Sequence, residues 1–222
     1  MSNFIDLFLN LDIMAQAWPL LLKGLVVTLK LCAVVIGLGL AGGLVLALAA
    51  LSPRRALKWP AICFIDLFRA LPPLVLLIFV YSGLPFTGLA LSPFMAVVIA
   101  FFLNNSAYFA EVFRAGIQSV PKGQTEAARA TGLSQGQTLL HVVVPQAVRN
   151  VLPDLLSNTV EVVKLTSLAS VVSLSELLYA ANMARSVTYN SSPLVLAAVI
   201  YLAILWPLVR LISRYQRGLA AH

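Results

Sequence analysis

The sequence predicts an all-α integral membrane protein with about five transmembrane helices, and three observations support this fold class. First, 60% of the 222 residues are hydrophobic, only 10% are charged and the mean hydropathy is +0.94, whereas about 25% of residues are charged in an ordinary soluble domain. Second, several apolar stretches reach the roughly 20 residues that a helix needs to cross a bilayer. Third, these stretches are continuous rather than alternating, which indicates helices and excludes a transmembrane barrel.

The predicted spans are separated by proline, glycine or clustered charge, which are signals of turns and loops. The first span contains Gly39 and Gly43, whose four-residue spacing lets a second helix approach closely. Cys32 and Cys63 have no metal-ligand spacing and are expected to be buried as small hydrophobic residues. The spans are predicted over about 20–51, 60–82, 91–110, 155–178 and 193–212.

The distribution of positive charge predicts the orientation of the chain. With the N-terminus outside, eleven of the fifteen Lys and Arg residues lie on the inner side, only Lys23 and Arg185 lie outside, and Lys30 and Lys164 lie within spans. Because Lys and Arg concentrate in inner loops, this orientation explains the net charge of +7 without a nucleic-acid partner. The eleven inner residues are Arg54, Arg55, Lys58, Arg69, Arg114, Lys122, Arg129, Arg149, Arg210, Arg214 and Arg217.

A polar segment over about 111–153 separates the third span from the fourth. Ser119 is expected to cap a first helix, which should end at Gly132 because glycine commonly ends helices. Ser134 and Gln137 have the spacing of a capping box, which begins a second helix. The segment is therefore predicted to form a helix–turn–helix on the inner side of the membrane.

The first helix of this segment has small side chains, Ala127 and Ala128, between Glu126 and Arg129. A helix with so few large apolar side chains buries little by itself, so it is suited to a groove on a partner protein. An ordinary solvated loop helix is the alternative interpretation. A DNA-binding function is disfavoured, because the segment has only four basic residues against two glutamates.

The polar segment resembles the EAA signature of the membrane subunits of bacterial ABC importers. It contains Glu126-Ala127-Ala128, then Gly132 and then Val142-x-Val144-Pro145, with valine where the family usually has Ile and Leu. Phe68-Arg69-Ala70-Leu71-Pro72 resembles the Phe-Arg-Gly-Thr-Pro element of the polar amino acid permease branch of that family. Similarity to this branch extends over about residues 20–215, with further matching stretches at 111–117, 121–124, 145–147 and 164–170.

The resemblance implies the fold of a type I ABC importer transmembrane domain, with the polar segment as a cytoplasmic coupling loop against a separate ATPase. The sequence contains no Gly-x4-Gly-Lys-Ser/Thr phosphate-binding loop. The chain is therefore expected to be no enzyme and to hold no metal or cofactor, with ATP and Mg²⁺ bound by the ATPase. The coupling residues implied are Gln124, Glu126, Ala127, Ala128, Arg129 and Gly132, and structural roles are implied for Arg69, Pro72, Pro145 and Pro153.

The resemblance also implies partners and a location. The partners are two copies of an ATP-binding subunit, a second permease subunit of the same or homologous sequence, a substrate-binding protein outside and the membrane lipids, without nucleic acid. The expected location is the bacterial inner membrane, in which the chain is multi-pass. Residues 1–19 are expected to form a periplasmic segment without the basic region of a cleavable signal, residues 20–215 a single permease domain and residues 216–222 a cytoplasmic tail.

Charged and polar residues inside the predicted spans are candidates for a substrate path. Glu161 and Lys164 are three residues apart in the fourth span, and intramembrane charges usually face a bundle interior or an aqueous path. A zwitterionic substrate needs charges of both signs, although a structural pair or side chains that reach the interface are alternatives. The uncharged candidates are Thr166, Ser167, Asn104 and Asn105.

The function that these observations predict is that of a permease subunit of an ATP-driven importer, which moves polar amino acids into the cytoplasm. Two alternatives belong to other classes. An energy-independent channel or secondary carrier for small polar solutes would transport without a partner, whereas a membrane anchor or sensor would transport nothing.

Overall fold

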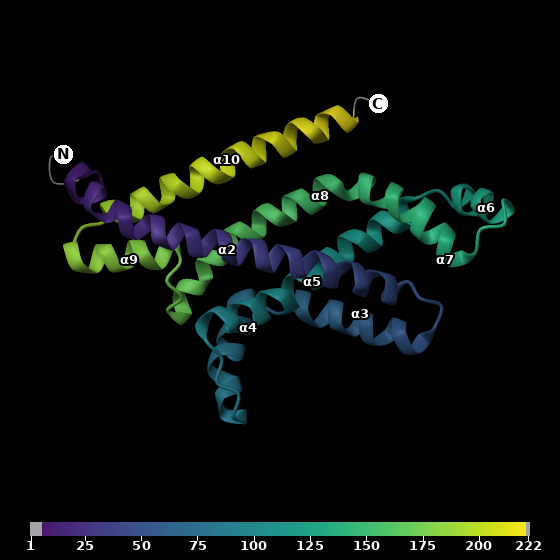
Figure 1. Ribbon diagram of the computed structural model, residues 1–222, viewed down its shortest axis with the longest axis horizontal. Helices are drawn as coiled ribbons and strands as arrows, with labels where there is room; N and C mark the ends of the chain where they lie inside the picture. The colour runs from purple at the N-terminus through teal and green to yellow at the C-terminus, as the bar shows by residue number, and fades with distance from the viewer. Residues whose placement is uncertain (1–5, 221–222) are drawn as a thin grey trace. The chain divides into compact units, whose positions relative to one another are not determined.

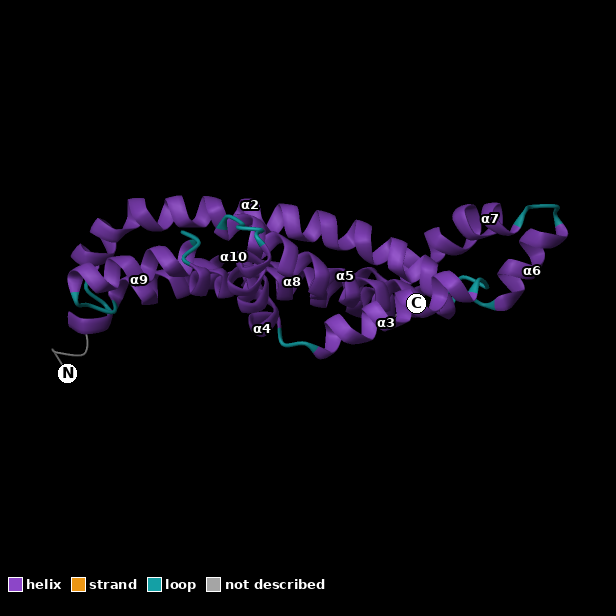
Figure 2. Cartoon of the chain, turned by 90° about the horizontal axis from the view of Figure 1, so that it is seen from below, coloured by secondary structure: helices purple, strands orange, loops and turns teal. Residues whose placement is uncertain are grey.

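The computed structural model describes residues 6–220 (Figure 1). The chain divides into two compact units. Unit 1 comprises the residues up to Ile36, Pro73–Phe101 and the residues from Val160 onward. Unit 2 comprises Gly37–Pro72 and Phe102–Thr159. Every regular element within the described part is helical, as Figure 2 shows, which confirms the predicted all-α class.

Three long helices, α2, α5 and α8, contribute residues to both units. The α-helices are α2 (Leu11–Ala50), α3 (Arg55–Ala70), α4 (Pro73–Ile78), α5 (Pro93–Ser119), α6 (Lys122–Ala130), α7 (Gln135–Thr138), α8 (Val144–Leu165), α9 (Leu177–Thr188) and α10 (Ser192–Ala220). Two π-helical turns, η1 (Phe79–Gly83) and η3 (Leu139–Val143), and two 3₁₀ segments, η2 (Leu84–Thr87) and η4 (Thr166–Val172), interrupt or extend them.

Within the described residues, four helical stretches are long and apolar enough to cross a membrane, and the interrupted pair Arg55–Ala70 and Pro73–Thr87 makes a fifth if it counts as one span. The first helix begins at Leu11 rather than at about residue 20, and α5 continues to Ser119 rather than to about residue 110. The four uninterrupted stretches are Asp6–Ala50, Pro93–Ser119, Gln135–Val172 and Ser192–Arg214.

The second predicted span is interrupted in the structure. Helix α3 ends at Ala70 and α4 begins at Pro73, with Leu71 and Pro72 between them. Proline has no backbone N–H and disfavours the helical conformation in the residue before it. Two consecutive prolines therefore end α3. An average of hydropathy over the whole stretch does not reveal such a local effect.

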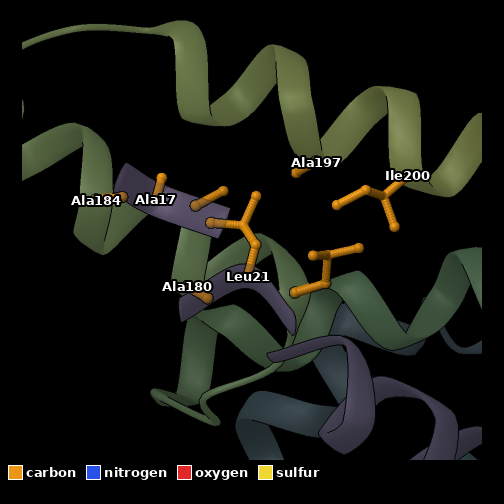
Figure 3. Close-up of a cluster of buried hydrophobic side chains, with 8 residues drawn as sticks. Ala17, Leu21, Ala180, Ala184, Ala197 and Ile200 are labelled. Carbon is orange, nitrogen blue, oxygen red and sulfur yellow. The ribbon is translucent and has the colours of Figure 1, made fainter. Parts of the chain in front are cut away.

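In unit 1, α9 and α10 pack with the N-terminal part of α2 around a cluster of mostly small side chains (Figure 3). Small residues let helix backbones approach one another closely in membrane proteins. Gly24 of α2 is such a point, because a Cβ atom there would lie 2.8 Å from the Glu176 carbonyl oxygen. The buried cluster comprises Ala17, Leu21, Leu177, Ala180, Ala181, Ala184, Ala197 and Ile200.

Helix α9 occupies a segment for which the sequence analysis predicts no helix of its own. Glu176 caps its N-terminus and accepts hydrogen bonds from the backbone N–H groups of Leu178 (2.9 Å) and Tyr179 (2.7 Å). The buried Glu176 carboxylate also accepts a hydrogen bond from the Tyr201 hydroxyl of α10 at 3.1 Å. The preferred N-cap residues are Ser, Thr, Asp and Asn rather than Glu, so the start of α9 at Glu176 could not be recognised from the sequence.

In unit 2, the C-terminal half of α2 packs against α5 through the predicted glycines. A Cβ atom on Gly43 would lie 2.6 Å from the Phe109 Cβ, and one on Gly39 would lie 3.2 Å from the Phe109 ring. The close approach predicted from their spacing is confirmed. Of the two cysteines, Cys32 is buried as predicted, but Cys63 is exposed. Cys63 lies on an outward face of α3, and an apolar sequence alone does not indicate which face of a helix points outward.

Candidate functional site

The helix predicted from the EAA segment is α6, which follows α5 in the chain and lies beside α7 (Figure 2). Its N-cap is Pro121, and no side chain caps it, so the expectation that Ser119 caps it is wrong. The Ser119 hydroxyl instead donates a hydrogen bond to the Gly116 carbonyl at 2.7 Å and accepts one from the Asn150 amide at 2.9 Å. Ser119 thereby ends α5 and joins it to α8 within unit 2.

The predicted end of α6 and the predicted start of α7 are both confirmed. Gly132 follows α6 with φ of +89°, a left-handed conformation that glycine adopts without strain. The Arg129 guanidinium donates a hydrogen bond to the Leu133 carbonyl at 2.8 Å, which fixes the turn. The Ser134 hydroxyl then accepts from the Gln137 N–H at 3.3 Å, and the Gln137 side chain accepts from the Ser134 N–H at 2.9 Å, which completes the capping box.

Helix α6 is exposed along its length except at one residue. Ala128 is 8% exposed and turns toward its own chain, whereas Glu126 and Ala127 are exposed. The Gln124 side-chain oxygen accepts a hydrogen bond from the side-chain amide of Gln146 in α8 at 3.5 Å. A helix of nine residues that buries only Ala128 leaves nearly all of its surface free for another protein.

Pro145 lies at the start of α8, directly after the π-helical turn η3. Because proline has no N–H, the carbonyl of His141, four residues earlier, cannot receive the usual helical hydrogen bond from it. Within this turn the Val144 N–H bonds to the Leu139 carbonyl, five residues earlier, as in a π-bulge. Pro153, the other proline expected to be structural, lies inside α8 and is buried.

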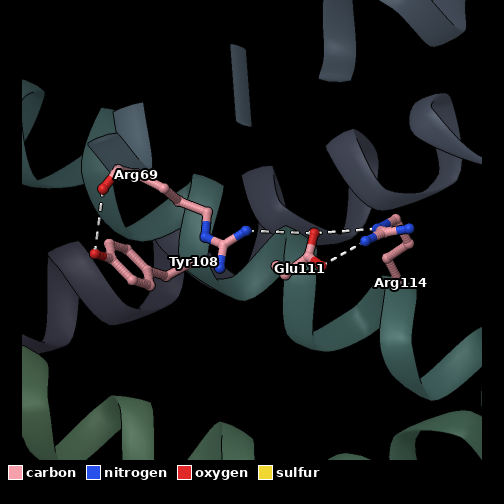
Figure 4. A network of polar contacts seen from close by, with 4 residues as sticks. All are labelled: Arg69, Tyr108, Glu111 and Arg114. Carbon is pink, nitrogen blue, oxygen red and sulfur yellow. Dashed lines mark hydrogen bonds and ion pairs between the residues drawn. The ribbon is translucent and has the colours of Figure 1, made fainter. Parts of the chain in front are cut away.

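Arg69, at the end of α3, lies in a polar network with residues of α5 (Figure 4). Its guanidinium is 3.6 Å from the Glu111 carboxylate, which is also paired with Arg114. The Arg69 guanidinium carbon lies 5.7 Å from the centroid of the Tyr108 ring, within the range of a cation–π contact. Tyr108, which the sequence analysis did not single out, is therefore part of the same network.

The carbonyl groups that the two prolines leave without helical partners receive hydrogen bonds from α5. Pro72 and Pro73 lack the N–H groups that would reach the carbonyls of Phe68 and Arg69, four residues earlier. The Asn104 side-chain amide donates to the Phe68 carbonyl at 2.9 Å, and the Tyr108 hydroxyl donates to the Arg69 carbonyl at 3.4 Å. Asn104 thus has a structural use within unit 2.

Of the candidate path residues in unit 1, Glu161 and Lys164 lie together and are exposed. The Lys164 Nζ is 2.6 Å from a Glu161 carboxylate oxygen, and the side chains are 50% exposed for Lys164 and 66% for Glu161. Thr166 is buried, and its hydroxyl donates to the Val163 carbonyl at 2.7 Å. The Ser167 hydroxyl donates to the Lys164 carbonyl at 2.8 Å. Asn105, the remaining candidate, belongs with Asn104 to unit 2 and is buried.

Among residues 6–220, no group of three or more His, Cys, Asp and Glu side chains could hold a metal ion. The described chain contains at least four helical stretches long and apolar enough to cross a membrane, with the short exposed helix α6 between two of them. These features define an integral membrane protein with a short polar helix exposed between two of its spans.

Comparison with known proteins identifies the family. Residues 33–220 match the family described as "Binding-protein-dependent transport system inner membrane component". The chain is 37% identical over 196 residues to the probable amino-acid ABC transporter permease protein YckA of Bacillus subtilis, covering 88% of this chain and 87% of the relative. It is 34% identical over 218 residues to the arginine transport system permease protein ArtQ of the same bacterium, covering 96% of this chain and all of the relative.

A solved structure agrees with this result. A crystal structure of an amino acid ABC transporter with histidines matches with a TM-score of 0.85 and 36% identity, over 92% of this chain and 96% of the solved one. The inward-facing MetNI methionine ABC transporter shares the fold, with a TM-score of 0.75 at 18% identity. The chain belongs to the family of binding-protein-dependent transport system inner membrane components. It is a multi-pass, non-enzymatic permease subunit of an ABC transporter, whose ATPase activity comes from a separate subunit.

Proposed function

We propose that this permease subunit imports polar amino acids into the cytoplasm and is coupled to its ATPase through α6. The amino-acid class is supported by relatives and by a solved structure that are amino acid ABC transporters. The channel and anchor alternatives lose their support, because the family consists of components of binding-protein-dependent transport systems.

The exposed surface of α6 is the observation that carries the coupling role. Glu126 and Ala127 face away from their own chain, while Ala128 anchors the helix and Gly132 ends it. Small side chains permit close approach to a groove, and Glu126 gives this surface one negative charge. Gln124 and Arg129 have partners within the chain and hold α6 in place.

The proposed assembly contains two ATP-binding subunits, which hold ATP and Mg²⁺, and two permease subunits that are identical or homologous. A substrate-binding protein delivers the amino acid from outside. The chain lies in the bacterial inner membrane with its positively charged loops and C-terminal end inside. The polar loop between the third and fourth spans then faces the cytoplasm, where ATP is available.

Charge reversal on α6 tests the coupling role. Glu126→Lys should abolish ATP-dependent uptake in proteoliposomes and reduce co-purification of the ATPase, because a positive charge replaces the negative charge of the contact surface. Arg185→Glu is the matched control, since it makes a charge change of equal size on an exposed residue of α9 and should leave both measurements near wild type. Wild-type uptake and ATPase stimulation in Glu126→Lys would refute the coupling role of α6.

The exposed pair of Glu161 and Lys164 is the proposed contact for a zwitterionic substrate, with one charge for each substrate group. Glu161→Gln and Lys164→Gln should each raise the substrate concentration for half-maximal uptake at least several-fold, because charge-assisted hydrogen bonds contribute about 1.5–3 kcal/mol. ATPase co-purification should not change. An unaltered concentration dependence in both variants would leave the pair with a structural role only.

A further inference from the structure

A pocket of about 790 Å³ lies within unit 2, beside α6 and α7. Its walls come from segments that are far apart in the sequence, namely the end of α2, the end of α5, α6, α7 and the turn η3. The volume falls within the range of sites that hold small molecules. The family membership and the coupling role of α6 do not account for a cavity on this side of the helix.

The pocket is built at the ends of three membrane-spanning stretches. Leu48 belongs to the last turn of the first stretch, Ile117 to the last turn of α5 and Leu139 to the beginning of the stretch Gln135–Val172. The distribution of Lys and Arg assigns these ends to the inner side of the membrane. Leu48 and Leu51 lie at the inner end of the first predicted span, so the apolar wall that they form is at the level of the inner-leaflet head groups, whereas α6 and α7 lie on its cytoplasmic side.

The lining combines apolar surface with positive charge. Leu48, Leu51 and Ile117 are among the residues that supply apolar side chains. The charged residues that line the pocket are both basic, Lys122 and Arg129, and the lining contains no aspartate or glutamate. These two residues are seven positions apart on α6, which places them on one face of the helix. An occupant of complementary chemistry has a negatively charged group joined to an apolar part.

A buried polar group in the same pocket has no partner. Thr138 lines the pocket and is 2% exposed, and its Oγ1 atom has no hydrogen-bond partner within the described structure. A buried hydroxyl without a hydrogen bond costs about 1–3 kcal/mol. Thr166, which is also buried, avoids that cost by donating to a backbone carbonyl in the preceding turn. Because that oxygen has almost no accessible surface, an occupant with hydrogen-bonding oxygens would reach it only after the Thr138 hydroxyl turns toward the pocket.

We propose that this pocket binds an anionic phospholipid of the inner leaflet. Lys122 and Arg129 pair with the lipid phosphate, and the apolar walls contact the glycerol and the first acyl carbons. A free phosphate ion has no apolar part to match these walls. A segment of the ATPase is the rival occupant, and it is distinguished by binding measurements on the assembled complex.

Native mass spectrometry of the purified permease–ATPase complex tests the proposal. The delipidated complex is incubated with dioctanoyl-phosphatidylglycerol, with dioctanoyl-phosphatidylcholine or with inorganic phosphate. Phosphatidylglycerol should bind at least tenfold more tightly than phosphatidylcholine, and excess inorganic phosphate should not displace it. The same spectra report the number of ATPase subunits, so a failure of the coupling role of α6 is separable from a failure of lipid binding.

Removal of the two positive charges supplies the first variant. Lys122→Gln/Arg129→Gln should weaken phosphatidylglycerol binding about 30-fold, because each basic residue near an anionic lipid contributes about 1 kcal/mol and 1.4 kcal/mol corresponds to tenfold. Arg149→Gln/Arg185→Gln is the control, since it removes the same charge from exposed residues that do not line the pocket. It should change the affinity by less than threefold.

Two glycines provide a second variant that does not alter charge. Gly136 lines the pocket and Gly123 does not, and an added Cβ would meet no atom within 4 Å at either position. Gly136→Phe should therefore obstruct the pocket and reduce phosphatidylglycerol binding at least tenfold, whereas Gly123→Phe should not.

Any of four results would overturn the proposal. The first three are equal binding of the two phospholipids, displacement of phosphatidylglycerol by inorganic phosphate, and unchanged affinity in both the charge and the Gly136→Phe variants. Lipid binding by the free permease that disappears in the assembled complex would also overturn it, since the occupant would then be a segment of the ATPase.

Discussion

At the scale of single residues, the glycines of α2 have different roles although the sequence presents them alike. Gly43 lies against Phe109 and the backbone of α5, whereas a Cβ on Gly37 would meet nothing within 4 Å. The four-residue spacing of Gly39 and Gly43 was enough to predict a close helix approach. Their partner could not be predicted, because spacing on one helix carries no information about which other helix packs there.

Alanine substitution separates these roles. Gly43→Ala should lower the free energy of unfolding by about 1–3 kcal/mol, because the new Cβ would lie 2.6 Å from the Phe109 Cβ and 2.9 Å from the Ala110 backbone nitrogen. Gly37→Ala should be neutral or stabilising by up to about 1 kcal/mol, since alanine favours a helix more than glycine does. Equilibrium unfolding in mixed detergent micelles measures both. An equal effect of the two substitutions would contradict the packing of α2 on α5.

At the scale of elements, the sequence predicts local contacts better than tertiary ones. The end of α6 at Gly132 and the capping box of Ser134 involve residues within one turn, so the sequence predicts them. The hydroxyl of Ser119, by contrast, bonds to Asn150, 31 positions away, instead of capping α6. The start of α9 was not predictable, because its N-cap is Glu176 and glutamate is not a preferred N-cap residue.

The break between α3 and α4 gives a prediction at this scale. Asn104→Ala should cost about 1–3 kcal/mol of stability, because the Phe68 carbonyl loses its donor. In a Pro72→Ala background the cost should shrink, since the alanine introduced there has an N–H group for that carbonyl. A double-mutant cycle of unfolding free energies measures this coupling.

Tyr108→Phe provides the comparison for that cycle, because the Tyr108 hydroxyl bonds to the Arg69 carbonyl instead. Its effect should add to that of Pro72→Ala without coupling. Full additivity of Asn104→Ala and Pro72→Ala would show that Asn104 does not replace the missing proline N–H.

At the scale of the whole molecule, hydropathy and charge predicted the number of spans, the class of fold and the orientation. Hydropathy and the distribution of charge are summed over many residues, so an error at a single position has little effect on these predictions. The division into two units was not predictable in this way, because α2, α5 and α8 each contribute to both units without any interruption in their sequence pattern. The exposed α6 was found because its polarity contrasts with the apolar chain around it.

The orientation predicts which sites a membrane-impermeant thiol reagent reaches. In a background with Cys32 and Cys63 replaced by alanine, Arg185→Cys should react in intact spheroplasts. Thr131→Cys, beside α6, should react only in inverted vesicles, and both positions are exposed in the structure. A permeant maleimide should label both and serves as the control. The reverse pattern would invert the proposed topology and place α6 on the side without ATP.

The hydrogen bonds at the end of α3 also have an evolutionary consequence. The side chains of Asn104 and Tyr108 donate hydrogen bonds to backbone carbonyls at the end of α3. Those carbonyls have no helical partner because Pro72 and Pro73 lack N–H groups. In a lineage that loses either proline, selection on the corresponding α5 residue should relax. Substitutions at 72 and 104, and at 73 and 108, should therefore arise in pairs across homologous permeases, even though the residues of each pair are more than 30 positions apart in the chain.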